Sequence, residues 1–306
     1  MPSVAEQVDS AVAALAAGDL VILPTETVYG LAADAANPAA VARLYEAKGR
    51  PRFNPLIAHV AGLGEAQAMA ALDERALTLA AAFWPGPLTL VAPSLTGVCD
   101  LARAGLDTVA VRAPAHPVAQ AMLMAFGGPV AAPSANRSGR PSPTTCADAF
   151  AETGAFAALA LDGGPCAIGL ESTVVSLLDG PPRLLRPGAI TRGQIEALIG
   201  ALAEAETDAR RSPGRLTRHY APAAPLRLEA TEAGPGEAFI GFGDVGPGKL
   251  NLSPTRDLAE AAARLFSFLR AADAGGPTAI AVAPIPEEGL GEAINDRLRR
   301  AAVGRE

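Results

Sequence analysis

Residues 48–59 combine positive charge with a stiff backbone. Lys48, Arg50 and Arg52 alternate with other residues at the start of this segment, prolines interrupt it, and His59 closes it. Because proline restricts the backbone, the cationic side chains are held on a rigid connection that can present them to an anion. The segment therefore predicts an anion site, although a short Lys/Arg cluster taken alone is more often a solvated loop.

Other chemistry-bearing residues lie where apolar segments end. Residues 24–30 and 133–143 are rich in hydroxyl groups, and Arg112 and Arg186 each end an apolar run. Open α/β sheets bind ligands beyond the ends of their strands. We therefore expect one concave site rich in cations and hydroxyls; for each arginine taken singly, a surface ion pair is the alternative. His116 begins a predicted helix away from these turns, and we expect it to be a structural or capping residue.

The elements that position these residues follow from apolar periodicity and from turn and capping residues. The predicted strands of a first domain, 1–203, are 20–23, 55–60, 88–91, 109–112, 129–132, 159–161, 171–177 and 184–186. Its predicted helices are 4–17, 37–47, 72–84, 116–126 and 191–202. A linker follows at 204–225, and a small α/β domain at 226–306 has predicted strands 226–228, 238–242 and 279–283 and helices 255–272 and 290–303. The fold class is α/β in both domains.

Composition limits the ligand class. The 306 residues carry a net charge of -7, the pI is about 5.1, and aromatic residues are 4% of the chain. Proteins that hold nucleic acid by broad electrostatics normally have a basic face, so a small anion such as a nucleotide is the better expectation. The chain has no P-loop and no H-E-x-x-H pattern.

Location and redox state can also be judged from the sequence. No apolar run reaches the roughly 20 residues that span a bilayer. The first segment carries Glu6 and Asp9, which argues against a secretory signal, so we expect a cytoplasmic protein. Cys99, Cys146 and Cys166 are an odd number without a C-x-x-C pair, so neither a disulfide framework nor a zinc knuckle is predicted.

Six stretches, in chain order, resemble the successive motifs of the YrdC family of threonylcarbamoyl-adenylate synthases. They are Pro-Thr-Glu-Thr-Val-Tyr-Gly-Leu at 24–31, Lys-Gly-Arg-Pro at 48–51, Asn-Pro-Leu at 54–56, Trp-Pro-Gly-Pro-Leu-Thr at 84–89, Ala-Pro-Ser-Ala-Asn at 132–136 and Leu-Arg-Pro-Gly at 185–188. Ser-Pro-Gly at 212–214 and His-Tyr-Ala-Pro at 219–222, followed by the small domain, are similar to the long two-domain form of the family.

The resemblance implies a fold and a reaction. It implies a twisted YrdC-like sheet with flanking helices and a concave site, followed by a Rossmann-like C-terminal domain. The implied enzyme is a nucleotidyltransferase that converts L-threonine, bicarbonate and ATP, with Mg²⁺ accompanying the ATP, into threonylcarbamoyl-AMP and pyrophosphate. The product would serve N6-threonylcarbamoyladenosine (t6A) formation at position 37 of tRNA, through a separate downstream threonylcarbamoyl transferase.

The resemblance also implies roles for individual residues. Lys48 and Arg50 would be the catalytic cations, and His219 and Tyr220 would form a lid. Residues implied to bind threonine are Thr27, His59, Arg112, Ala132 and Ser172. Residues implied to bind ATP are Lys48, Arg50, Asn54, Thr108, Ser134, Asn136, Ser142 and Arg186. No protein-made metal site is implied.

Two alternatives remain at this point. A YrdC-like concavity could bind structured RNA, making the chain an RNA-binding or ribosome-associated module. The acidic charge and the few aromatic residues argue against direct tRNA binding as its main role. The same fold also occurs in carbamoyl-transfer domains of hydrogenase-maturation proteins, but this chain lacks the accompanying acylphosphatase and zinc-finger motifs.

Overall fold

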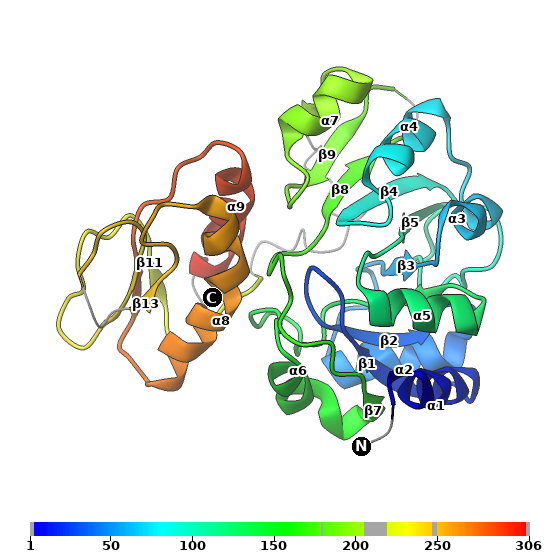
Figure 1. Ribbon diagram of the computed structural model, residues 1–306, viewed down its shortest axis with the longest axis horizontal. Helices are drawn as coiled ribbons and strands as arrows, with labels where there is room; N and C mark the ends of the chain where they lie inside the picture. Colours follow the sequence, from blue (N-terminus) through cyan, green and yellow to red (C-terminus); the bar gives the residue numbers. More distant parts are fainter. Residues whose placement is uncertain (1–2, 179, 205–218, 247–249, 304–306) are drawn as a thin grey trace.

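The computed structural model describes residues 3–178, 180–204, 219–246 and 250–303. Within these residues the chain forms two α/β units, each built on its own sheet (Figure 1). The α/β fold class predicted from the sequence is therefore confirmed. Most of the predicted linker, residues 205–218 with the Ser-Pro-Gly motif, lies outside the described residues.

The first unit has a mixed sheet with strand order β10-β9-β8-β4-β5-β3-β6-β2-β1-β7 among the described residues. Its strands are β1 (Leu20–Leu23), β2 (Gly30–Asp34), β3 (Ile57–His59), β4 (Leu88–Pro93), β5 (Thr108–Arg112), β6 (Val130–Ala131), β7 (Ala157–Ala160), β8 (Thr173–Ser176), β9 (Arg183–Arg186) and β10 (Ala203–Glu204). β3 pairs in parallel with β5, and β4 pairs in parallel with β8. β4 pairs antiparallel with β5, and β8 antiparallel with β9.

The helices of this unit begin and end at residues suited to those positions. They are α1 (Val4–Ala16), α2 (Pro38–Lys48), α3 (Leu63–Met69), α4 (Glu74–Phe83), α5 (Pro117–Phe126), α6 (Cys146–Thr153) and α7 (Arg192–Ile199), with a short 3-10 helix, η1, at Gly154–Phe156. Asn37 caps α2 by accepting from the backbone of the first turn, and Gly49 ends it with a φ of 57°, which favours glycine. This ending delivers Lys48 and Arg50 to the site.

Helices cover the first sheet unequally. On one face, α2, α3, α4 and α7 pack on residues of nearly every strand. On the opposite face, α1 and α5 cover the side formed by β1, β2 and β6. The rest of that second face keeps only a small apolar cluster, made of Ile57, Val91, Ala110, Val174 and Leu185. This less covered part of the sheet is where a ligand can reach the strands.

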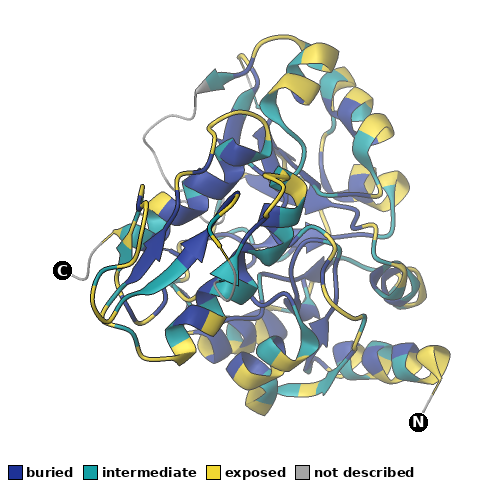
Figure 2. Cartoon of the chain, turned by 60° about the vertical axis from the view of Figure 1, so that its left-hand side comes forward, coloured by how far each residue is buried: buried dark blue, intermediate teal, exposed yellow. Residues whose placement is uncertain are grey.

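The second unit is a small parallel sheet with order β11-β14-β12-β13 among the described residues. Its elements are β11 (Leu226–Arg227), β12 (Ala238–Gly241), β13 (Leu250–Asn251), α8 (Leu258–Ala274), β14 (Ile280–Val282) and α9 (Leu290–Ala302). Helices α8 and α9 lie between this sheet and the first unit (Figure 1). Figure 2 shows both buried and intermediate residues in the strands of the molecule; in this second sheet β14 is buried, whereas no residue of β11 or β13 is.

Most predicted elements are present, with ends shifted by a few residues, and His116 caps α5 as expected, its Nδ1 accepting from Val118 N at 3.2 Å. The sequence analysis missed β2, α3 and α6, as well as the two-residue strands β10 and β13. β2 has the sequence Gly-Leu-Ala-Ala-Asp, and these residues rarely favour a strand, so its conformation comes from pairing with β1 and β6. Among the described residues, no helix has the length and apolar character needed to cross a membrane.

Candidate active site

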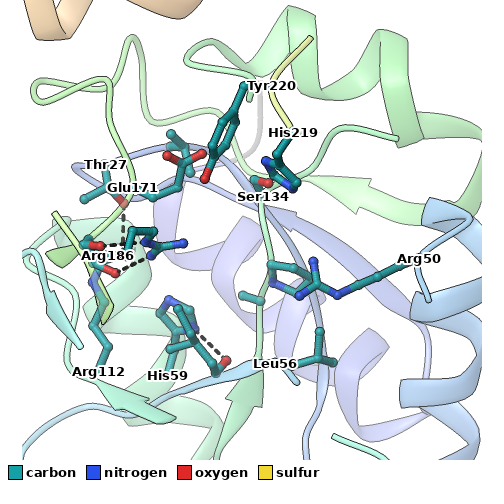
Figure 3. Close-up of a pocket in the computed structure, with 15 residues that line it drawn as sticks. Thr27, Arg50, Leu56, His59, Arg112, Ser134, Glu171, Arg186, His219 and Tyr220 are labelled. Carbon is teal, nitrogen blue, oxygen red and sulfur yellow. Dashed lines mark hydrogen bonds between the residues drawn. The ribbon is translucent and has the colours of Figure 1, made fainter. Parts of the chain in front are cut away.

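A cavity lies over the less covered part of the first sheet, and Figure 3 shows the side chains around it. It contains about 490 Å³ of space, including open solvent at its mouth. Its lining residues are Thr27, Val28, Arg50, Leu56, Ile57, His59, Arg112, Ala132, Pro133, Ser134, Glu171, Ser172, Arg186, His219 and Tyr220. The structure thus brings together, around one cavity, residues from both ligand sets and from the lid predicted from the sequence.

Strand register explains why distant residues meet here. Ile57 and His59 are two positions apart on β3, so their side chains point to the same face of the sheet. His59 is paired with Arg112 on β5, and Val174 on β8 is paired with Arg186 on β9. Paired residues share a face, so strands β3, β5 and β9 present His59, Arg112 and Arg186 toward the cavity.

Arg112 is held by three neighbours at the cavity wall. Its Nη2 donates to Glu26 Oε1 at 2.6 Å, its Nη1 to Thr27 Oγ1 at 2.9 Å, and its Nε to the Gly86 carbonyl at 3.1 Å. A guanidinium has five N–H groups, so two remain for another acceptor. Burial alone would raise the pKa of Glu26, but Arg112 outweighs that effect and lowers it, which keeps Glu26 ionised. Arg112 is therefore fixed in place with donors to spare, as a carboxylate-binding arginine needs to be.

His59 is buried beside Arg112. Its Nδ1 lies 3.2 Å from the Ile57 carbonyl, which can only accept, so this nitrogen carries the proton. Burial, with a smaller contribution from Arg112, lowers the pKa of His59 to about 3. His59 is therefore neutral near pH 7 and can serve in polar recognition without adding charge.

Ser172 and Arg186 form the adjoining part of the wall. Ser172 Oγ lies 2.7 Å from Thr89 Oγ1 and accepts from Arg186 Nη2 at 3.0 Å. Arg186 Nε also donates to the Ser172 carbonyl at 3.0 Å. Burial lowers the pKa of Arg186. An anion in the cavity would reverse that effect, because it stabilises the charged form.

Arg50 lines the other side of the cavity. Its Nε donates to the Asn54 carbonyl at 3.2 Å and its Nη2 to the Pro55 carbonyl at 3.0 Å. It forms no ion pair with a carboxylate within the described part of the chain, and burial lowers its pKa to about 10. A buried cation without a counter-ion is costly, so this position favours an anionic ligand.

Lys48 lies beneath the loop at 133–143. Its Nζ donates to the carbonyls of Ser134 and Asn136, and its own carbonyl accepts from Ser138 N at 2.8 Å. Burial and the nearby Arg50 lower the pKa of Lys48 well below its ordinary value. Lys48 therefore shapes this loop from below, while Ser134 at its edge lines the cavity.

Five of the predicted residues do not line the cavity. Lys48 and Asn136 belong to the loop just described, where Asn136 Nδ2 donates to the carbonyls of the two arginines at 137 and 140. Asn54 adjoins Arg50. Ser142 Oγ donates to Glu171, behind the wall. Thr108 begins β5, the strand that Arg112 ends, so the two lie about 13 Å apart along the strand at roughly 3.3 Å per residue.

Glu171 is the lining residue of most consequence that the sequence analysis missed. Oε1 of this buried carboxylate accepts from Ser142 Oγ, and Oε2 accepts from Arg297 Nε at 3.0 Å. Burial alone would raise the pKa of Glu171, but Arg297 and Arg186 outweigh it and lower it. A signal was present, because a carboxylate directly precedes Ser172. Val28, Leu56, Ile57 and Pro133 were also missed as lining residues.

His219 and Tyr220 lie over one side of the cavity, opposite His59 and Leu56 (Figure 3). Their rings meet edge to face at 4.0 Å, and Tyr220 also packs on Phe266 of α8 at 5.4 Å. The backbone N–H of Ala221, the next residue, donates to the Gly139 carbonyl at 2.7 Å. His219 and Tyr220 thus line the cavity, and their role as a lid stays a prediction.

Within the described residues, no group of three or more histidine, cysteine, aspartate or glutamate side chains could hold a metal ion. Glu171, a carboxylate at the cavity, is already bound to Arg297 and Ser142.

Comparison with known proteins adds an independent line of evidence. The model of the Sua5–YciO–YrdC family, described as telomere recombination, matches residues 13–188, and the model described as threonylcarbamoyl-AMP synthase, C-terminal domain, matches residues 190–303. The threonylcarbamoyl-AMP synthase of Bacillus subtilis is 40% identical, over 98% of this chain and 94% of its own. That of Pyrococcus abyssi is 41% identical, over 93% and 91%. The crystal structure of P. abyssi Sua5 complexed with L-threonine has a TM-score of 0.91 at 37% identity, covering 97% of this chain and 94% of that one.

Proposed function

The chain belongs to the Sua5–YciO–YrdC family, in the two-domain form with the threonylcarbamoyl-AMP synthase C-terminal domain, and we propose that it makes threonylcarbamoyl-AMP from L-threonine, bicarbonate and ATP. It is an enzyme of the nucleotidyltransferase type, since relatives that align with almost its whole length are named threonylcarbamoyl-AMP synthase, an enzyme of that type. No feature of the described structure favours the RNA-binding alternative over this one.

The reaction has two bond-forming steps. The threonine amine attacks the carbon of bicarbonate or carbon dioxide, forming the N–C bond of a carbamate. With bicarbonate, the hydroxyl group leaves as water with one amine proton; with carbon dioxide, that proton is released. A carbamate oxygen then attacks the α-phosphorus of ATP, the bond to the bridging oxygen breaks, and pyrophosphate leaves. Neither step needs an enzyme nucleophile, so the protein's contribution is positioning and stabilisation of charge.

Threonine is assigned to the wall formed by Arg112, His59 and Ser172. Arg112 is held by Glu26 and Thr27 and has N–H groups left, so it would bind the threonine carboxylate as a charge-assisted pair. Neutral His59 and the Ser172 hydroxyl would take the polar groups of the amino acid. Thr27 and Ala132 complete this side of the cavity.

ATP is assigned to the side formed by Arg50, Arg186 and Ser134. The two arginines would neutralise charge on the phosphates, where it builds up as the bond to pyrophosphate breaks. Lys48 would act indirectly, because its Nζ donates to the carbonyls of Ser134 and Asn136 and so holds the loop that carries them. Asn54, Thr108 and Ser142 were also assigned to ATP from the sequence, and they stay predictions.

Mg²⁺ would enter with ATP, on the phosphates, as it commonly does with few protein ligands. The lid would exclude water, which matters because a carbamate and a mixed anhydride both hydrolyse readily. The product would then pass to a separate transferase that modifies tRNA.

One observation carries this proposal: a single cavity is lined by Arg112 from the predicted threonine set and by Arg50 and Arg186 from the predicted ATP set. The test is isotopic. Incubation with ¹³C-bicarbonate, L-threonine and MgATP should yield threonylcarbamoyl-AMP whose mass is increased by the label. Adenylate products without the label would show that the carbamate is not made from bicarbonate and would contradict the proposal.

A further inference from the structure

Helix α9 of the C-terminal domain inserts one arginine into the catalytic domain. Arg297 is completely buried. Its Nε donates to Glu171 Oε2 at 3.0 Å, and its Nη1 donates to the Pro187 carbonyl at 2.9 Å and to Asp296 Oδ2 at 2.8 Å. Two of these three acceptors belong to the catalytic domain, so Arg297 acts well beyond its own helix.

The contacts of Arg297 converge on the side of the cavity assigned to ATP. Glu171, which it binds, accepts a hydrogen bond from the Ser142 hydroxyl. Pro187, whose carbonyl it binds, directly follows Arg186. Ser142 and Arg186 were both assigned to ATP, whereas Thr27, His59 and Arg112 on the threonine side form no hydrogen bond with Arg297 among the described residues. Ser172, also on the threonine side, follows Glu171 in the chain but is hydrogen-bonded to Arg186 and Thr89.

Arg297 also supports the lid. Its guanidinium carbon lies 5.4 Å from the centre of the Tyr220 ring, within range of a cation–π contact. Tyr220 has a φ of 65°, a conformation that costs a bulky residue energy and persists only where the surroundings fix it. Arg297, together with His219 and Phe266, supplies such surroundings.

Domain docking alone does not explain an arginine at this position. Replacing a buried ion pair by apolar residues of similar volume is often neutral or stabilising, so an apolar side chain would serve docking at least as well. In addition, neither Arg297 Nη2 nor the Tyr220 hydroxyl has a hydrogen-bond partner among the described residues. The Tyr220 hydroxyl, on a residue that lines the cavity, therefore keeps hydrogen-bonding capacity for a ligand.

We propose that Arg297 is a positioning residue of the synthase, through which the C-terminal domain fixes the ATP side of the cavity and the lid. It acts by holding the Glu171 carboxylate and the Pro187 carbonyl, and by supporting Tyr220. The inference rests on the proposed function for its kinetic consequence, but its effect on nucleotide binding can be measured without turnover.

The test compares Arg297→Gln and Arg297→Lys with a control on the same helix. Glu292 also crosses the domain interface, pairing with Arg192 at 3.3 Å, but both side chains are partly exposed and neither lines the cavity. Glu292→Gln therefore removes a cross-domain ion pair without touching Glu171. The readouts are KM for ATP, kcat, the Kd for L-threonine and the Kd for α,β-methylene-ATP, which resists cleavage at the reacting bond.

Arg297→Gln should raise both KM for ATP and Kd for α,β-methylene-ATP at least about tenfold, because it leaves the buried Glu171 carboxylate without its charged partner on α9. The Kd for L-threonine should change by less than about twofold. Arg297→Lys should lose less nucleotide affinity than Arg297→Gln, because lysine keeps the positive charge. Glu292→Gln should bind both ligands as the wild type does. A role in docking alone would instead weaken both ligands together.

The proposal is overturned if folded Arg297→Gln binds both ligands as the wild type does, or if Glu292→Gln weakens the nucleotide equally. If Arg297→Gln does not fold, the same measurements are made on Arg297→Lys and Glu171→Gln. The proposal then requires that these variants lose affinity for α,β-methylene-ATP but not for L-threonine. If the wild type makes no threonylcarbamoyl-AMP while Arg297→Gln still loses nucleotide affinity, the proposed function fails and the positioning role stands.

Discussion

Arg112 Nη2 lies 2.6 Å from Glu26 Oε1, so the arginine assigned to the substrate carboxylate already has a carboxylate partner of its own. The pair is almost wholly buried, with side-chain exposures of 4% for Arg112 and 12% for Glu26. Glu26 offsets the cost of burying the charge and fixes the direction of the guanidinium, while two N–H groups remain for a ligand. Threonine would thus meet a site prepared before binding.

Arg112→Ala should weaken L-threonine binding by about 2 to 5 kcal/mol, because it removes one partner of a desolvated charge pair. Isothermal titration calorimetry with L-threonine measures this loss. Arg299→Ala is the control, since Arg299 forms an exposed pair with Glu287 on the C-terminal domain. Near-normal threonine affinity, or near-normal turnover at sub-saturating threonine, would remove Arg112 from the substrate site.

Tyr220→Phe should leave the protein as stable as the wild type or slightly more stable, yet reduce its activity. The buried hydroxyl has no hydrogen-bond partner among the described residues, so its loss relieves a cost, while the ring keeps its packing on His219 and Phe266. If the hydroxyl binds a charged ligand group, its loss should slow product formation about tenfold or more. Thermal unfolding and product assays measure the two effects; full activity would reduce Tyr220 to a packing residue.

Lys48→Met should weaken nucleotide binding and stability together. The methionine fills the space of the lysine stem but leaves the carbonyls of Ser134 and Asn136 without a donor, at about 1–3 kcal/mol for each unsatisfied group. Calorimetry with α,β-methylene-ATP and urea unfolding test this expectation. Arg52→Met, an exposed change in the same segment, should have neither effect. Unchanged nucleotide affinity in folded Lys48→Met would show that the loop does not depend on this lysine.

The buried histidine His59 should make stability depend on pH. Its pKa is about 3 in the folded chain against 6.5 ordinarily, so below about pH 6.5 the unfolded chain takes up a proton that the folded chain does not. Stability contributed in this way is complete above 6.5 and is lost as pH falls toward 3, by up to about 1.4 kcal/mol per pH unit.

His59→Asn lacks this titration, so its unfolding free energy should fall less steeply than that of the wild type between about pH 7 and about pH 5. Urea unfolding of both proteins across this range measures the slopes. Above about pH 7 the difference between the two should be constant, which provides the internal control. Parallel curves over the whole range would show that His59 is not held neutral by the fold.

Much of this architecture could be predicted because local sequence and tertiary structure agree. Leu20–Leu23 is an uninterrupted apolar run and forms β1 with the predicted bounds, and Asn37 with Pro38 starts α2. β2 could not be predicted, since glycine and alanine carry no strand signal and its conformation comes from two neighbouring strands.

The site was predicted in part for the same reason. Arg112, Arg186 and Ser134 follow or end apolar strands, which is a position visible in sequence. Glu171 and Arg297 were missed because their importance lies in a contact between residues 126 positions apart, in different domains. Helical spacing in α9 does place Arg297 on the apolar face with Ala293 and Ile294, and Arg297 is buried whereas Arg299 is exposed, but the local sequence does not show that Glu171 lies opposite that face.

The most direct test of the central claim is pyrophosphate release by the purified protein with ATP, Mg²⁺ and bicarbonate, in the presence and absence of L-threonine, with serine as the control amino acid. The account predicts release that requires both threonine and bicarbonate and that is much lower with serine. Release that is independent of threonine, or no release together with tight tRNA binding, would contradict it and favour the RNA-binding alternative.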